Sequence, residues 1–401
     1  MSTTVIERPA SFSFSKNEVR YVLHTTGSIS FLQVKVVYKL TGSEQVIDLK
    51  TYALNPNPDG KTYIYLSKLL AGLLSFVVPD PAQAVTSAGK QCIQFAIHFR
   101  ERTPGDNEPA WITTETNHWR WLLQGGVEQQ IASRNNIFTA LAASKQFLTW
   151  LPSGRYVFPM EKLWLTFLNQ ASLNGISLKL RKKLFNADAT DTTTTLTLSA
   201  GLLHHIQVSP LFLGLNADIE ARNLHWYEVS LVNNDNPAIT SSYRFYIEYR
   251  PLYNQHFFVY QNSLSGIDTV AVAGQVELTQ KRAVEEIETG LDLNDWQSTV
   301  KRGEKSHLTI RAERTYKGDI GFLRTRRHAE AMQDLLLSKC IFERMFDRWV
   351  PILNIQSSGT MPSTEETLYN MPIEWQLPFS NEVYTPDDIE LNKGIDTEIY
   401  E

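Results

Sequence analysis

The sequence predicts a mainly β protein made of tandem β-sandwich modules, followed by a C-terminal β-rich region that contains one or two short helices. Hydrophobic and polar residues alternate over many short runs, as they do in strands with one buried face. Clusters of Pro, Gly, Asn and Asp separate these runs, and helical periodicity is scarce.

The first module is expected over residues 1–125. The run "FLQVKVVYKL" (31–40) alternates as a strand with one buried face does. A second strand is expected at 63–65, with a helix beginning at Ser67, and a third in "CIQFAIHF" (92–99). Turn signals separate these runs at 55–60, 79–81 and 103–107.

The second module, over 126–250, resembles the first. The stretches that match in character are 31–42 with 176–187, 63–74 with 196–206, and 92–99 with 225–232. We therefore hypothesise a duplication in which Val34 and Leu178 lie in equivalent strands, as do Phe95 and Glu228. The alternative is that two β-rich stretches align this loosely by chance.

The C-terminal region is expected over 251–380, with a helix at 328–339 where hydrophobic residues repeat every 3.6 positions. In "FFVYQNSLSGIDTVAVAGQV" (257–276), two strand-like runs flank a polar centre, which predicts a β-hairpin. The structural turn comprises Asn262, Gly266 and Asp268: Gly266 is expected to adopt positive φ, and Asp268 to bond the turn backbone. The alternative is that these polar residues form the lip of an active site.

Composition limits the class of protein. The chain has 401 residues, 42% of them hydrophobic and 20% charged, which is typical of a soluble globular protein. A net charge of −5 argues against a nucleic-acid partner. No apolar run reaches 18 residues, so no membrane insertion is expected, and the N-terminus has no signal-peptide pattern. Only two cysteines occur, Cys92 and Cys340, too few for a disulfide framework or a CxxC metal site.

No motif points to catalysis. The adjacent His204 and His205 lack the i,i+2 or i,i+4 spacing of metal ligands. Glu286 and Glu288 share a strand face and could form a carboxylate pair, but a solvated sheet edge explains them equally well. Nucleophile-elbow, dinucleotide-binding and P-loop motifs are absent from the sequence. We therefore expect no enzyme activity, catalytic residue, metal or cofactor.

Two charged segments are candidate subunit contacts. The basic segment 311–328 is either a solvated loop or an arginine-rich contact, and the acidic tail 381–401 could dock onto a neighbour or be disordered. The possible contact residues are Arg311, Arg314, Arg324, Arg326, Arg327, Trp375 and Phe379.

Several stretches carry a resemblance. The hairpin "NSLSGIDT", with "FSKNEVRYVLHT", "NPDGKTYIYLSKLL", "LLLSKCIFER" and "VPILNI", resembles uncharacterised tail proteins, of the baseplate or tail tip, from phages and prophages of the Bacteroidetes. Where that family has a glycine pair in the hairpin, this chain has Ser265-Gly266, a departure from the pattern. The resemblance implies a virion structural protein that is made in the host cytoplasm, contacts other tail proteins and joins a ring or homo-oligomer.

Two alternatives stay open. A carbohydrate-binding or adhesin protein, which recognises a host surface glycan, would use Trp119 and Trp121 as sugar platforms. A polysaccharide depolymerase would need catalytic carboxylates, for which the acidic run 285–288 is the candidate.

Overall fold

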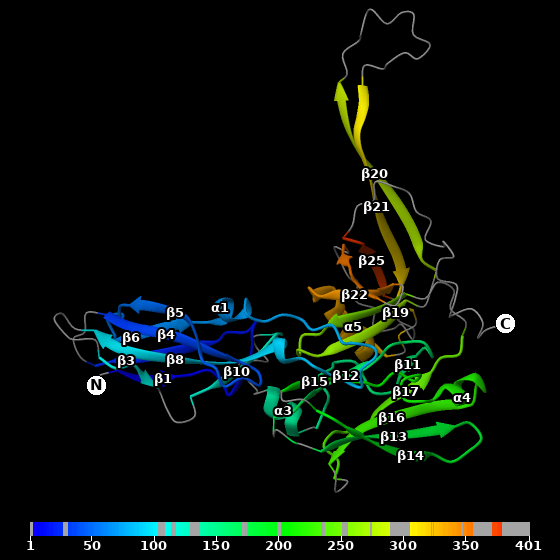
Figure 1. Cartoon of the computed structure of the whole chain (residues 1–401), viewed down its shortest axis with the longest axis horizontal. Helices are drawn as coiled ribbons and strands as arrows, with labels where there is room; N and C mark the ends of the chain where they lie inside the picture. Colours follow the sequence, from blue (N-terminus) through cyan, green and yellow to red (C-terminus); the bar gives the residue numbers. More distant parts are fainter. Residues whose placement is uncertain are drawn as a thin grey trace, which may run out of the picture. The chain divides into compact units, whose positions relative to one another are not determined.

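The computed structural model describes most of the chain and divides it into two compact units. Unit 1 comprises Met1–Arg250 and Tyr260–Thr269, and unit 2 comprises Pro251–Val259 and Val270–Glu401. The described residues are 3–26, 31–102, 109–113, 118–128, 137–143, 145–170, 173, 175–198, 202–233, 237–250, 256–272, 275–288, 305–321, 323, 325–345, 348–355 and 371–378. The acidic tail 381–401 lies outside them. The fold is mainly β, as predicted (Figure 1).

The first module of unit 1 is a pair of sheets around one core. The larger sheet has the order β2 (Phe12–Phe14), β10 (Arg120–Leu123), β8 (Cys92–Arg102), β4 (Phe31–Leu40) and β5 (Ile47–Leu54), and β9 (Ile112–Thr113) pairs with β8. The smaller sheet has the order β1 (Thr3–Glu7), β3 (Arg20–Thr25) and β6 (Lys61–Tyr65), and helix α1 (Ser67–Ala71) follows β6. The alternation that predicted β4 buries Leu32, Val34 and Val36 against Phe95 and Ile97 of β8.

The second module also has a larger and a smaller sheet around one core. Its larger sheet has the order β11 (Arg155–Val157), β17 (Tyr243–Ile247), β16 (Leu224–Asn233), β13 (Ile176–Leu184) and β14 (Thr190–Leu196). Its smaller sheet has the order β12 (Trp164–Leu168), β15 (Leu203–Gln207) and β7 (Val85–Ser87). The helices are α3 (Ile137–Ala143) and α4 (Asn216–Glu220), and a 3₁₀ turn spans Gly89–Gln91. Because β7 comes from the first module's stretch of chain, this sheet joins the two modules.

The two larger sheets have the same topology. In each, the first strand pairs parallel with the last, and the other neighbours are antiparallel. Val34 in β4 and Leu178 in β13 occupy the same position in the strand order, as do Phe95 in β8 and Glu228 in β16. One matched stretch was wrong: β6 corresponds to β15 at 203–207, whereas the sequence match placed it at 196–206.

Two further sheets and one helix follow, and apart from residues 260–269 they belong to unit 2. The first sheet has the order β19 (Ile267–Val272), β18 (His256–Gln261), β22 (Ile341–Met345) and β23 (Arg348–Pro351), and the second has β20 (Glu277–Glu288), β21 (Lys305–Asp319), β25 (Pro372–Gln376) and β24 (Leu353–Asn354). Helix α5 (Arg326–Leu337) begins at an N-cap, Thr325, and buries Ala329, Met332 and Leu335, so the predicted helix is confirmed two residues earlier than expected.

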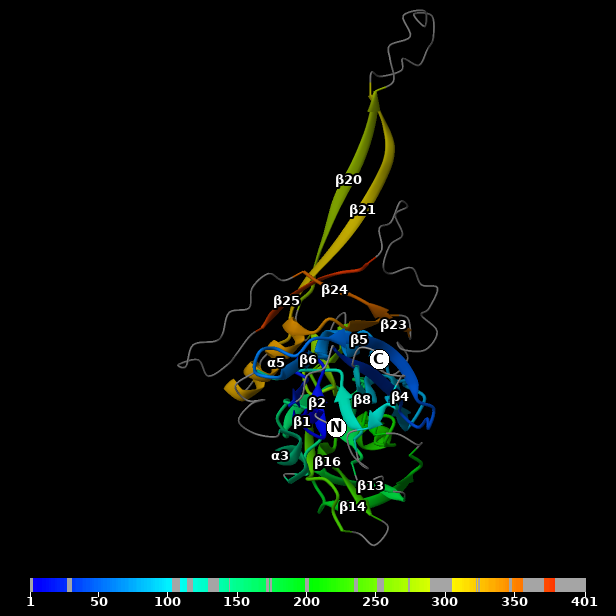
Figure 2. The same cartoon turned by 90° about the vertical axis from the view of Figure 1, so that its left-hand side faces the viewer.

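Strands β20 and β21 form a long two-stranded ribbon, which extends away from the rest of unit 2 in both views (Figures 1 and 2). Only the base of β21, Thr315–Asp319, also pairs with β25. We call the remainder, 280–288 with 305–314, the arm.

The predicted hairpin is also present, as β18 and β19. Its base belongs to unit 2, and its tip, residues 260–269, belongs to unit 1. Among the described helices, none is both long and apolar enough to cross a membrane.

Candidate functional site

The polar hairpin tip is buried within unit 1. Asn262 is 2% exposed, Ser265 0% and Asp268 3%, and Leu264 lies in a hydrophobic cluster with residues of both modules, among them Phe14 and Leu148. A turn this polar is usually solvated, so its burial needs partners for every hydrogen-bonding group. These partners define the candidate functional site.

The segment after β10 binds the tip through its backbone. The Gln124 carbonyl accepts hydrogen bonds from Ser265 Oγ at 2.7 Å and from Gln261 Nε2 at 2.9 Å. The Gly126 N–H donates to the Ser263 carbonyl at 2.8 Å. The tip is therefore fixed to the end of the first module.

The second module binds the other side of the tip. Asn262 Nδ2 donates to the Leu148 carbonyl at 2.8 Å and to Asp268 Oδ2 at 2.9 Å, and Asp268 Oδ1 accepts from Thr149 Oγ1 at 2.5 Å. Asn262 Oδ1 accepts from the N–H groups of Leu264 and Gly266. Asn262 thus supplies the bonds to the turn backbone that we had expected from Asp268.

The expectation of positive φ at Gly266 was wrong. Ser265 has the positive value, φ 67°. Gly266 is needed for a different reason: a Cβ there would overlap the Leu148 carbonyl oxygen and lie 2.7 Å from Asn262 Nδ2. The glycine permits a close approach between two backbones.

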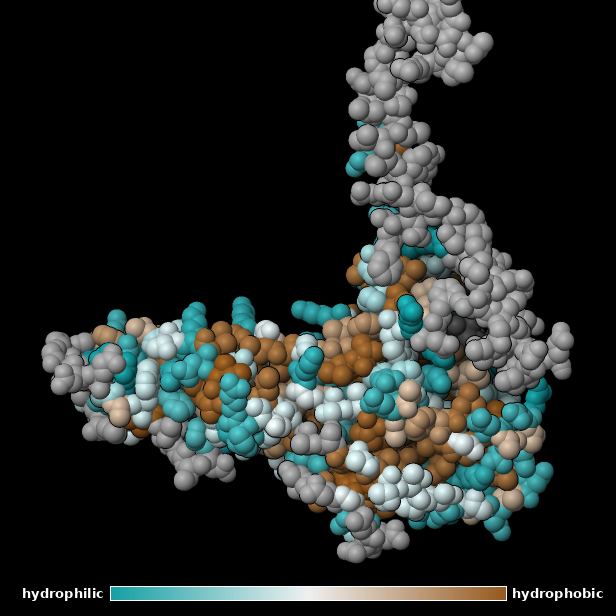
Figure 3. All heavy atoms as spheres, viewed as in Figure 1, coloured by the Kyte–Doolittle hydropathy of each residue, from teal (hydrophilic) through white to brown (hydrophobic). Residues whose placement is uncertain are grey.

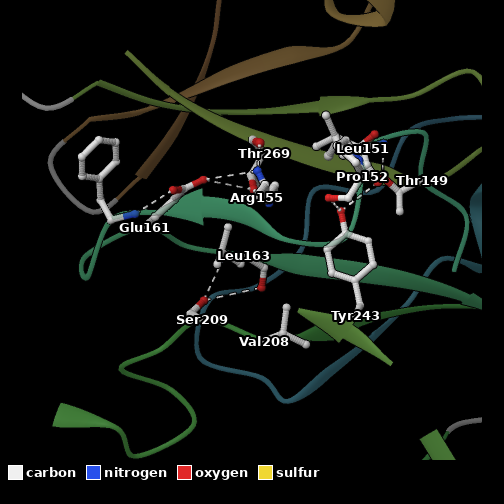
Figure 4. A network of polar contacts seen from close by, with 12 residues as sticks. Thr149, Leu151, Pro152, Arg155, Glu161, Leu163, Val208, Ser209, Tyr243 and Thr269 are labelled. Carbon is white, nitrogen blue, oxygen red and sulfur yellow. Dashed lines mark hydrogen bonds and ion pairs between the residues drawn. The ribbon is translucent and has the colours of Figure 1, made fainter. Parts of the chain in front are cut away.

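A charged network lies beside the tip (Figure 4). Arg155 of β11 donates from Nη1 to the Thr269 carbonyl at 2.8 Å and from Nη2 to Thr269 Oγ1 at 3.0 Å. Glu161 Oε1 lies 3.7 Å from Arg155 Nη1, and Glu161 Oε2 accepts from the Phe158 N–H at 3.2 Å. The Tyr243 hydroxyl lies 2.9 Å and 3.0 Å from the carbonyl oxygens of Leu151 and Pro152, to which it donates.

Burial dominates the electrostatics of this network. It raises the pKa of Glu161 above its usual range, although Arg155 and the Phe158 N–H act in the opposite direction. For Arg155, burial alone lowers the guanidinium pKa, and the combined effect of Glu161, Tyr243 and Asp268 raises it, so the group stays charged. Burial also raises the pKa of Tyr243. These side chains bind one another and the backbone, so the arrangement anchors the hairpin tip.

The two adjacent histidines have structural surroundings. Both are fully buried in β15. His205 lies between Thr166 Oγ1, 2.9 Å from Nδ1, and Gln91 Oε1, 2.7 Å from Nε2. Burial, and then His204, lowers the pKa of His205 to about 3, so its ring is neutral. Within the described ranges, no three His, Cys, Asp or Glu side chains gather as metal ligands would.

Among the predicted contact residues that the structure describes, two are buried and two are exposed. Trp375 is fully buried in unit 2, where it stacks on Tyr316 at 5.5 Å and donates to Glu343 Oε2 at 2.9 Å, so it is not available as a surface contact. Arg314 is also buried, at 8% exposure. Arg326 and Arg327 are exposed at the start of α5, where Arg326 pairs with Glu330 at 2.8 Å.

The basic segment is not a loop, because β21 and α5 include most of it. The backbone of Arg311 pairs with Ala283 in the arm. Arg324 and Phe379 lie outside the described residues, as does the acidic tail.

The proposed sugar platforms are partly covered. Lys39 Nζ lies 4.9 Å from the centroid of the Trp119 ring, and Trp121 packs against the cluster around Leu264. Sequence reasoning missed a polar groove of about 360 Å³ on the larger sheet of the second module. It is lined by Lys179, Arg181, Glu228, Ser230, Val232, Ala238 and Ser242. The alternation of polar residues along β13 and β16 was the available signal.

Comparisons with known proteins add little. No protein-family model matches the chain, and no curated protein matches it. Among solved structures, the chain is similar to a marsupial T cell receptor at 10% sequence identity, over 80% of this chain and 96% of that chain, with a TM-score of 0.20. A score this low carries no argument about function.

Proposed function

We propose that this chain is a non-enzymatic structural protein of a phage tail or tail-like particle, in its baseplate or tail tip, and that it acts through subunit contacts. The arm is the observation that carries the proposal. Along the arm, β20 is the one described strand that pairs with β21, and the arm residues Lys281, Glu285, Glu286 and Glu313 are exposed. The described part of the ribbon visible in Figure 3 is mostly hydrophilic.

An isolated two-stranded ribbon is marginally stable in water, and its edges present unpaired backbone groups. Such a ribbon becomes more stable when another chain pairs with its edge or packs on its face. A tail protein repeats around the axis of the particle, so this chain would join a ring with other virion proteins.

Removal of the arm tests the proposal. Gln280 and Arg314 face each other across the ribbon, so residues 281–313 can be replaced by Asn-Gly, which forms a two-residue hairpin turn. Glu288 and Lys305 also face each other, and replacement of 289–304 by Asn-Gly gives a matched control that keeps the arm.

We expect particles from the producing strain to lack the arm-less protein, or to have incomplete tails, and the control variant to be incorporated normally. The measurement is the protein content and electron microscopy of purified particles. Complete, infective particles in a strain that lacks the whole gene would show that the structural assignment is wrong.

The glycan-binding alternative has less support, because Lys39 covers Trp119 and Trp121 packs in a core cluster. A glycan array separates it from the leading proposal. Binding that is lost in Trp119→Ala and Trp121→Ala variants would favour the adhesin reading, and hydrolysis of host polysaccharide would favour a depolymerase.

A further inference from the structure

Strand β20 lies at the edge of its sheet, whose order is β20, β21, β25, β24. In the described part of unit 2 its one hydrogen-bonded neighbour is β21. Alternate N–H and C=O groups of β20 therefore point toward the open edge, over a strand of 12 residues. An edge this long is a template for another strand.

The sequence of this edge is self-complementary in charge. Residues 281–286 read Lys-Arg-Ala-Val-Glu-Glu, so two cations precede two anions with two small apolar residues between them. When two copies of such a strand run antiparallel, the cations of each copy lie beside the anions of the other, once on each side of the two-fold axis. A like-charged or unordered edge has no such property.

We propose that β20 pairs antiparallel with β20 of a second copy of this chain, about a two-fold axis at Ala283. This inference rests on the proposed function, since it names the partner of the arm. Backbone geometry restricts the register of this pair. Along a strand, residues that direct their N–H and C=O groups to the same edge are an even number of positions apart. Two directly opposed residues must therefore have sequence numbers that differ by an even number. Centred on Ala283, Lys281 lies opposite Glu285 of the second copy, and Arg282 lies diagonal to its Glu286.

The register within the arm extends this pattern. Lys281 faces Glu313 across β20 and β21, and Glu285 faces Thr309. In the dimer, one row across four strands would read Glu313, Lys281, then Glu285 and Thr309 of the second copy, and the charges of its first three residues alternate in sign. The three charged residues of this row, Lys281, Glu285 and Glu313, are exposed. A two-fold contact of this kind is isologous and closed.

Charged residues on an edge strand also serve to prevent pairing, which is the competing explanation. Charge reversal separates the two. Lys281→Glu with Arg282→Glu gives an edge that is acidic throughout, and Glu285→Lys with Glu286→Lys gives a basic one. The four changes together restore complementarity with the order inverted.

The test is sedimentation velocity of the full-length protein over a range of concentrations at low salt. We expect dimers of the wild type and of the fourfold variant, and a loss of affinity of at least tenfold in each twofold variant. An equimolar mixture of the two twofold variants should form heterodimers. Rescue by the fourfold variant and by the mixture excludes misfolding as the cause.

A cross-link tests the register. Ala283→Cys lies at the axis and should form an intermolecular disulfide under mild oxidation, whereas Thr279→Cys, four positions away, should not, because its two copies are too far apart.

A wild type that stays monomeric at every concentration, or dimers that are indifferent to all charge changes, would overturn the inference. If the arm were still required in particles, the proposed function would survive that result. Normal particles from a strain that lacks the protein would contradict the proposed function, but they would not contradict the pairing of β20.

Discussion

Gly266 lies where the hairpin tip comes closest to the backbone of the second module. A side chain there would overlap the Leu148 carbonyl oxygen, and a carbonyl fixed in the backbone cannot rotate away. Asn262 could not relieve the overlap either, since its amide already bonds Leu148 and Asp268. The glycine is therefore required by lack of space, and the backbone strain of this turn lies at Ser265.

Gly266→Ala should therefore destabilise unit 1 by about 2 kcal/mol or more through overpacking. The matched control is Gly72→Ala, at the exposed C-terminus of α1, where an added Cβ meets only the Leu69 carbonyl oxygen at 3.8 Å. Hydrogen exchange of the β18 and β19 amides under native conditions measures the difference. Equal protection in the two variants would contradict the close approach.

Glu161 makes the stability of unit 1 depend on pH. Burial raises the pKa of Glu161 in the folded state above the ordinary value of 4.5. Between pH 4.5 and this raised pKa, the folded state therefore binds more protons than the unfolded state. Stability therefore falls as the pH rises through this window. Glu161→Gln removes this group, so the stability of the wild type relative to the variant should decline across the window and then level off. Urea unfolding of both proteins at a series of pH values measures this difference in free energy of unfolding. A difference that rose with pH would show that folding lowers the pKa of Glu161, contrary to this prediction.

At the scale of the element, the sequence predicted strands where one face is buried. Alternation placed the strand at 31–40, where β4 lies, and it found both strands of the hairpin. It did not predict that the hairpin is buried on both faces. Asn262 bonds a carbonyl 114 residues earlier, and Arg155 bonds Thr269 across a similar separation. Contacts between residues so far apart in the sequence leave no periodic pattern. A solvated polar turn and a buried polar turn therefore have the same sequence signature.

The arm was missed for a related reason. Its sequence has few apolar residues, so 311–319 was interpreted as part of a basic loop, although β21 pairs with β20 from Lys305 to Lys317. The buried aromatic residues Trp375 and Tyr316 of unit 2 lie at the base of the ribbon, outside the arm.

Replacement of 281–313 by Asn-Gly should therefore change the free energy of unfolding of unit 2 by less than about 1 kcal/mol, as surface changes do. Trp375→Ala, in contrast, should cost about 3–5 kcal/mol. Urea unfolding followed by far-UV circular dichroism compares the two variants. A collapse of unit 2 on removal of the arm would mean that the arm is structural and would remove its support as a contact element.

For the whole molecule, the larger sheets of the two modules share one strand order, which is the feature that the hypothesis of a duplication predicts. The modules are also linked by side chains, since Gln91 bonds His205 and Ser265 of the hairpin tip bonds the Gln124 carbonyl. The modules are joined by β7 in the smaller sheet and by Leu264, which enters a cluster containing Phe14, Cys92, Leu123 and Leu203.

Cys92 provides a probe of this junction, because burial raises the pKa of its thiol to about 11 and the side chain is fully buried. Only an opening of the cluster exposes the thiol to a labelling reagent. Leu264→Ala should cost about 2–5 kcal/mol, which corresponds to an increase in the labelling rate of Cys92 of about thirtyfold or more. The background is Cys340→Ser, and the control is Leu337→Ala, since Leu337 is 72% exposed in α5. If both variants labelled at the wild-type rate, the hairpin tip would not hold the modules together, and β7 with the smaller sheet would have to do so alone.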